Sequence, residues 1–112
     1  MTYYEEVEFI ETGIFTKIIH DYMTDDEFCE VQNYLAENPQ AGDPLPGGLR
    51  KLRWRGKGKG KRGGFRIIHY WINPRNLIYL ITIYAKSERE DLPPNQMAYL
   101  VEWAKELRKE DQ

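Results

Sequence analysis

Apolar residues recur at the spacing of an α-helix in three segments of the chain. The first, Ile14–Tyr22, has apolar side chains at every third or fourth position, which predicts a helix with one buried face. The second begins at Thr24, which matches a capping box with Glu27 and predicts a helix that runs to Asn38. The third is expected to follow the prolines at positions 93 and 94 and to end near Lys109.

Four further segments have the pattern of β-strands. Glu6–Ile10 predicts a short first strand, and Leu49–Arg55 alternates between apolar and basic residues, as a strand with one buried face does. Phe65–Ile72 and Leu77–Ala85 are apolar on both faces, which predicts two central strands of a sheet. The turn-forming residues Asn73–Asn76 lie between them and make these two strands a hairpin.

The order of these elements predicts the fold class. One strand, two helices, three strands and a last helix indicate an α+β fold, in which an antiparallel, twisted sheet packs against N-terminal helices and a C-terminal helix. The stretch Gln40–Gly48, rich in proline and glycine, is expected to be a loop. A chain of 112 residues, 41% hydrophobic and 30% charged, suits one globular domain that covers residues 1–112.

Charge is distributed very unevenly along the chain. The net charge is only −2, yet no Asp or Glu occurs between Pro44 and Ser87, and all 18 acids lie outside that stretch. Such segregation within one domain favours a polyanionic partner, most commonly nucleic acid, although a merely solvated basic face is the alternative. The stretch holds most of the 16 lysines and arginines, namely Arg50, Lys51, Arg53, Arg55, Lys57, Lys59, Lys61, Arg62, Arg66, Arg75 and Lys86.

The predicted hairpin brings several of these cations to one end of the sheet. Counting back from the turn places Arg66 opposite Ile83 or Tyr84, with Lys86 just beyond. The loop Gly56–Gly64, which alternates glycine with lysine, leads directly into Arg66. The residues expected to gather there are Lys57, Lys59, Lys61, Arg62, Arg66, Tyr84 and Lys86.

The glycine loop admits two interpretations. It matches GxGxxG, but a strand follows it instead of a helix, so a dinucleotide site is not predicted. Its glycines would let the backbone approach phosphates closely, with lysines reaching to either side. The alternative is a flexible hairpin tip whose lysines keep a sheet edge soluble.

The remaining candidates for chemistry are weaker. His69 lies among apolar strand residues and is expected in the core, whereas His20 is expected on the surface near a helix end. Cys29 is expected to be a small buried residue, and one cysteine with two distant histidines predicts no metal site and no cofactor. The three tryptophans are expected in the core, although one exposed in the basic face could stack on a base. The acids Glu88, Glu90 and Asp91, just after Lys86, are expected to balance the charge of the basic cluster, and metal ligation is the less favoured alternative.

The expected compartment follows from two simple features. No apolar run approaches the roughly 18–20 residues that span a bilayer. The acidic, polar N-terminal stretch does not resemble a secretory signal. A cytoplasmic protein without membrane contact is therefore expected.

Two stretches of the chain carry a family resemblance. GGLRKLRWRGKGKGKRGGFRIIHYW (residues 47–71) and LIYLITIYAKSEREDL (residues 77–92) resemble the HigB branch of the RelE superfamily of bacterial toxins. The acidic helical N-terminal part and the C-terminal helix also fit, so the resemblance covers most of the chain. It implies a RelE-like fold and a ribosome-dependent endonuclease that cuts messenger RNA in the ribosomal A site. It also implies inactivation by a cognate antitoxin, a helix-turn-helix protein of the HigA type.

The resemblance also implies site residues. Arg66, Tyr84 and Lys86 correspond to the catalytic positions, and Lys57, Lys59 and Lys61 match the family's RNA-contacting basic residues. The family's tyrosine nearer the C-terminus has no counterpart in residues 92–95, so Tyr84 is the candidate substitute. The same basic stretch adds three further candidates for RNA binding, Lys51, Arg53 and Arg62.

The implied reaction is attack of a ribose 2′-hydroxyl on the adjacent phosphate without a metal. Arg66 and lysines of the glycine loop would stabilise the charge on the phosphate oxygens. Repulsion among clustered cations would lower the pKa of lysine and favour tyrosinate, so Lys86 or Tyr84 is the candidate base. The alternative functions are a non-catalytic nucleic-acid-binding module with a basic sheet face and a docking surface for an acidic protein.

Overall fold

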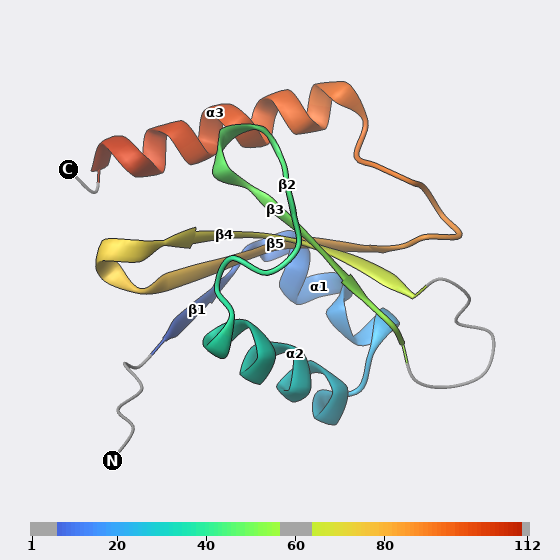
Figure 1. The fold of residues 1–112 in the computed structure, drawn as a ribbon. Coiled ribbons are helices and arrows are strands. Elements are labelled where there is room, and N and C mark those ends of the chain that lie inside the picture. The colour runs from blue at the N-terminus through green and yellow to red at the C-terminus, as the bar shows by residue number, and fades with distance from the viewer. Residues whose placement is uncertain (1–6, 57–63, 111–112) are drawn as a thin grey trace, which may run out of the picture.

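The computed structural model describes residues 7–56 and 64–110, and it shows a sheet with helices on both faces (Figure 1). Short 3-10 turns occur at Pro46–Gly48 and Asn73–Arg75. The predicted α+β class is confirmed, and both strands of the central hairpin have the predicted bounds. In chain order the elements are β1 (Glu8–Glu11), α1 (Gly13–Tyr22), α2 (Asp25–Glu37), β2 (Asp43–Pro44), β3 (Arg50–Trp54), β4 (Phe65–Ile72), β5 (Leu77–Ala85) and α3 (Pro94–Glu110).

The sheet is mixed, which corrects the prediction that it is antiparallel. Its strand order is β1-β5-β4-β3-β2, and the pairs from β2 to β5 are all antiparallel. β1 lies at one edge and pairs with β5 in parallel. After β1, the helices α1 and α2 cross one face of the sheet, and the chain enters the sheet again at the opposite edge as β2. Each of the next three connections reverses the direction of the strand, so β5 runs in the same direction as β1. The stretch Gln40–Gly48, expected to be a loop, contains the edge strand β2.

Each face of the sheet carries its own hydrophobic core, which explains why β4 and β5 are apolar on both faces. On one face, Phe15 of α1 and Leu35 of α2 pack with Ile67 of β4. On the other, Ala104 of α3 packs with Ile68 of β4. Figure 1 shows α3 and the α1–α2 pair on opposite sides of the strands. Each large apolar side chain that is fully buried contributes roughly 1.5–3 kcal/mol to the free energy of unfolding.

The two N-terminal helices begin at threonine caps. Thr24 accepts a hydrogen bond from the backbone N–H of Glu27 at 3.2 Å, as predicted.

Cys29 is exposed, so the prediction that it is buried is wrong. It precedes the buried Val31 by two residues, about 200° around the helix, which turns it toward solvent. Within the described part of the chain, no helix is long and apolar enough to cross a membrane.

Candidate functional site

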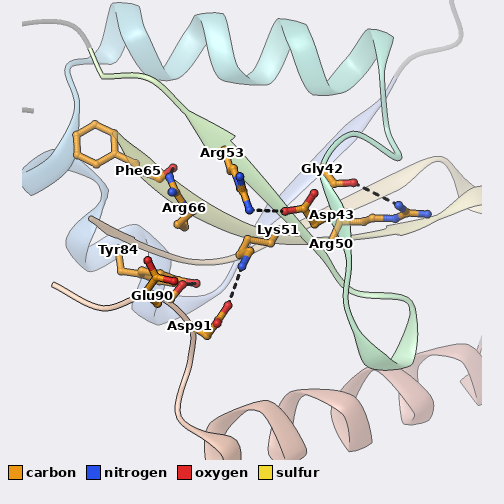
Figure 2. Close-up of polar contacts among 10 residues, drawn as sticks. All are labelled: Gly42, Asp43, Arg50, Lys51, Arg53, Phe65, Arg66, Tyr84, Glu90 and Asp91. Carbon is orange, nitrogen blue, oxygen red and sulfur yellow. Dashed lines mark hydrogen bonds and ion pairs between the residues drawn. The ribbon is translucent and has the colours of Figure 1, made fainter. Parts of the chain in front are cut away.

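The register of the sheet brings three of the predicted site residues side by side. Arg66 in β4 pairs with Arg53 in β3 on one side and with Tyr84 in β5 on the other. Directly paired residues project from the same face of a sheet, and Lys51 shares that face because it lies two residues from Arg53. Figure 2 shows these four side chains together. We call the surface formed by Lys51, Arg53, Arg66 and Tyr84 the Arg66 face.

Arg66 and Tyr84 form the buried floor of this surface. Arg66 is only 8% exposed, and its Nη1 donates a hydrogen bond to the carbonyl oxygen of Phe65 at 3.2 Å. Tyr84 is also buried, and its hydroxyl donates to the backbone carbonyl of Glu90 at 3.4 Å. The guanidinium carbon of Arg89 lies 5.9 Å from the centre of the Tyr84 ring. Both polar groups are therefore held in position by strands and by the segment after β5.

Two carboxylates already neutralise the outer cations of the Arg66 face. Lys51 Nζ lies 2.7 Å from Asp91 Oδ1, with the lysine side chain 12% exposed and the aspartate 63% exposed. Arg53 Nη2 lies 3.2 Å from Asp43 Oδ2, and both of these side chains are largely exposed (Figure 2). The expected charge balance by Asp91 is confirmed. The sequence gives no signal for the role of Asp43, because its proline- and glycine-rich surroundings are typical of a loop.

The environment of Tyr84 raises the pKa of its hydroxyl above the usual value near 10. Burial is the largest cause, and the negative charge of Asp91 adds to it, whereas the positive charge of Arg66 acts in the opposite direction. The prediction that clustered cations favour tyrosinate is therefore wrong for Tyr84. Its neutral phenol suits hydrogen bonding and proton donation better than proton abstraction.

Lys86 lies in the exposed turn that follows β5, at the same end of the sheet as Arg66. Its backbone N–H donates to the carbonyl oxygen of Gly64 at 3.1 Å, two residues before Arg66. Glu88 braces this turn, because it accepts hydrogen bonds from the Tyr22 hydroxyl at 2.6 Å and from the Ala85 N–H at 2.8 Å. Burial and this contact raise the pKa of Tyr22 to about 12.

Four predicted RNA-binding residues lie outside the described part of the chain. These residues, all in the glycine loop, are Lys57, Lys59, Lys61 and Arg62. The strands on either side of the loop are described: β3 ends at Trp54 and β4 begins at Phe65, and these two residues pair next to the Arg53–Arg66 pair. Their predicted role as RNA contacts therefore stays a prediction.

The two histidines lie away from the Arg66 face. His69 is fully buried, as expected, and its Nε2 lies 2.9 Å from the carbonyl oxygen of Ala41. Its Nδ1 has no hydrogen-bond partner among the described residues. His20 lies at the end of α1, exposed and 3.5 Å from Asp25. Within residues 7–56 and 64–110, no three His, Cys, Asp or Glu side chains are grouped to hold a metal ion.

Comparison with known proteins identifies a family and solved structures that are similar to this chain. A family model described as the RelE toxin of the RelE/RelB toxin–antitoxin system matches residues 9–112 of this chain. The crystal structure of the intact RelBE toxin–antitoxin complex from E. coli is similar to this structure with a TM-score of 0.49 and 11% sequence identity. That alignment covers 71% of this chain and 96% of the other.

Proposed function

The chain belongs to the RelE toxin family of toxin–antitoxin systems, and from this premise we propose that it is a ribosome-dependent messenger RNA endonuclease. Its substrate is messenger RNA in the ribosomal A site, and its cleavage stops translation in the cytoplasm. Its partner is a helix-turn-helix antitoxin of the HigA type, as the resemblance to the HigB branch implies. The match of residues 9–112 supports the family assignment, and the Arg66 face supports the chemistry.

The observation that carries this proposal is the buried arginine between a second arginine and a tyrosine. Arginine stays charged at any working pH, and its planar guanidinium can hold two phosphate oxygens at once. Arg66 is 8% exposed, so a phosphate that reached it would lie partly out of water, where electrostatic interactions are stronger. This environment suits stabilisation of a phosphate that gains negative charge in the transition state.

The proposed reaction needs one proton removed and one delivered. The 2′-oxygen bonds to phosphorus as the bond to the 5′-oxygen breaks, leaving a 2′,3′-cyclic phosphate and a 5′-hydroxyl. The raised pKa of Tyr84 suits it to give a proton to the departing 5′-oxygen, and Lys86 is the proposed base for the 2′-hydroxyl. A free lysine titrates near ~10.4 and is a poor base at neutral pH, so the precise placement of RNA on the ribosome supplies the remaining rate enhancement.

RNA would have to compete with the two aspartates of the Arg66 face. Its phosphates would exchange with Asp91 for Lys51 and with Asp43 for Arg53. The Arg53–Asp43 pair is largely exposed, and such pairs contribute only about 0.2–1 kcal/mol, so that exchange costs little. Lys51 is only 12% exposed, and the phosphate would keep it paired by taking the place of Asp91. We propose that the free toxin keeps its outer cations paired and that bound RNA replaces those carboxylates.

The decisive experiment compares Arg66→Ala with Lys105→Ala, a matched removal of one charge from an exposed position on α3. Each variant is induced in cells, and primer extension maps the cuts in ribosome-bound messenger RNA. Loss of Arg66 is expected to lower cleavage roughly 100-fold or more, whereas the control cleaves like the wild type. Circular dichroism checks that both variants fold.

Three outcomes would contradict parts of this proposal. Undiminished cleavage by a folded Arg66→Ala variant would remove the catalytic assignment. Efficient cutting of naked RNA by the pure protein would remove the ribosome dependence. Salt-sensitive RNA binding by the wild type without any cleavage would leave the chain as a non-catalytic nucleic-acid-binding module.

A further inference from the structure

A second basic cavity lies at the end of the sheet away from Arg66. It has a volume of about 250 Å³, and its lining includes Arg50 of β3, Arg108 of α3, and Tyr70 and Trp71 of β4. The pairing of β3 with β4 ends at Arg50 and His69, so Tyr70 and Trp71 continue along an edge of β4 beyond β3. Figure 2 shows the guanidinium of Arg50 directed away from the Arg66 face.

The two arginines of this cavity have no carboxylate partner among the described residues. Arg50 Nη1 donates to the carbonyl oxygen of Gly42 at 3.4 Å. Arg108 Nη1 donates to the carbonyl oxygen of Gly47 and to the Tyr70 hydroxyl. Each guanidinium has five N–H donors, and the hydrogen bonds to the described part of the chain use only Nη1, so within that part Nε and Nη2 have no partner. Lys51 and Arg53, in contrast, are both paired with aspartates.

Both arginines line the cavity, so an anion bound there would neutralise their charge and accept hydrogen bonds from Nε and Nη2. Trp71 is half-buried beside them, and its indole N–H donates to Asn76 Oδ1 at 3.3 Å, which orients the ring. The cavity is smaller than the roughly 300–1,000 Å³ of a typical small-molecule pocket, so it suits a phosphate group rather than a whole nucleotide. An arginine pair beside a fixed aromatic ring is typical of contacts to single-stranded RNA.

We propose that Arg50 and Arg108 form a second phosphate-binding site, which holds a phosphodiester of the same RNA strand that lies on the Arg66 face. The proposal rests on the proposed function for the identity of the RNA. Arg50 and Arg53 are three residues apart on β3, about 10 Å, and their side chains leave opposite faces of the strand. One strand of RNA would therefore pass from the Arg66 face around the edge of the sheet to reach this cavity. The site anchors RNA and takes no part in the bond-breaking step.

The test measures RNA binding as a function of salt concentration, with an RNA oligonucleotide methylated at every ribose 2′-oxygen so that it is not cleaved. The variants are Arg50→Gln, Arg108→Gln and the double variant. Lys105→Gln is the matched control, because it removes one charge from an exposed position of α3 outside the cavity. The slope of log K against log salt is expected to become shallower by about 0.7 for each phosphate that the variant no longer neutralises.

The double variant distinguishes one shared phosphate from two separate ones. If both arginines hold the same phosphate, the double variant loses little more slope than either single variant, because the two effects are not additive. A slope in both single variants equal to that of Lys105→Gln would overturn the proposal. If Arg108→Gln fails to fold, Arg50→Gln carries the test, since the one side-chain hydrogen bond of Arg50 to the residues that the structure describes is the long contact to Gly42 at 3.4 Å.

Two further measurements separate the possible ligands. Titration with inorganic phosphate is expected to shift the NMR signal of the Trp71 indole N–H in the wild type but not in Arg50→Gln. If the arginine variants weaken antitoxin binding and leave the RNA slope unchanged, the cavity binds an acidic protein segment and the RNA assignment is wrong. If the wild type binds RNA without cleaving it, the proposed endonuclease activity fails while the salt slopes still test this site.

Discussion

His69 makes the stability of this protein depend on pH in a way that can be calculated. The imidazole is fully buried, and Nε2–H donates to Ala41 while Nδ1 has no partner among the described residues. A second proton on the ring would therefore place an unpaired N–H and a positive charge in the core. Burial is the largest cause that lowers the pKa of His69 to about 4, partly opposed by the Ala41 hydrogen bond and reinforced by the charge of Arg50.

The direction of the effect follows from which state binds the proton. In the unfolded chain the pKa of His69 returns to its usual value near 6.5, so between pH 6.5 and pH 4 only the unfolded state is protonated. The neutral His69 ring makes its full contribution to the free energy of unfolding above pH 6.5. This contribution decreases as the pH falls and is lost below pH 4. The difference between the pKa of His69 in the unfolded and the folded state corresponds to about 3 kcal/mol in the free energy of unfolding. About 2.5 kcal/mol of this is lost when the pH falls to about 4.5.

Urea unfolding at about pH 7.5 and about pH 4.5 measures this loss, and His69→Gln is the comparison. Glutamine keeps a donor for the Ala41 carbonyl but does not titrate. The wild type should lose about 2.5 kcal/mol more stability between the two pH values than His69→Gln, because the carboxylates titrate alike in both. Equal losses in the two proteins would refute the reasoning.

Two further predictions concern the Arg66 face and the glycine that adjoins it. Asp91→Asn removes the carboxylate that competes with RNA for Lys51 and is expected to tighten binding of non-cleavable RNA by at least about 1.5-fold, because Lys51 is only 12% exposed and the pair is stronger than a fully exposed one of about 0.2–1 kcal/mol. Fluorescence anisotropy checks this against Glu102→Gln, an equal charge change at an exposed position of α3, and unchanged affinity in Asp91→Asn would contradict it. Gly64→Ala is expected to cost more than about 1 kcal/mol of stability, because Gly64 has a φ of +66° and an added Cβ would lie 2.1 Å from the Trp54 carbonyl oxygen. Gly13→Ala, whose Cβ would meet nothing within 4 Å, is the control, and a denaturation midpoint that falls equally in both variants would refute the assignment.

The local elements of this protein were largely predictable from its sequence. The two apolar segments became β4 and β5 with the predicted bounds, because strands buried on both faces carry a strong apolar pattern. The turn between them limited the register to two possibilities, with Arg66 opposite either Ile83 or Tyr84. In the structure Arg66 pairs with Tyr84. Thr24 caps its helix as predicted, because capping depends on residues only three positions apart.

Most of the features that were missed depend on contacts in space that the pattern of apolar and polar residues does not reveal. The parallel pairing of β1 with β5 joins residues about 70 positions apart, and nothing in the apolar pattern of β1 specifies its direction. Asp43 and Asp91 lie outside the acid-free stretch, yet folding brings them to Arg53 and Lys51. The raised pKa of Tyr84 follows from the same cause, because burial and Asp91 outweigh the cation beside it.

The sequence by itself determined the helices, the central hairpin, the segregation of charge and the presence of Arg66 and Tyr84 at one end of that hairpin. These depend on periodicity, turns and composition, which are properties of neighbouring residues. Only the tertiary structure decided which cations are paired with carboxylates, and that Arg50 and Arg108 share a cavity in which neither has a carboxylate partner among residues 7–56 and 64–110. Electrostatic interactions depend on distance and burial in space, and both are set by packing between segments that are far apart in the chain.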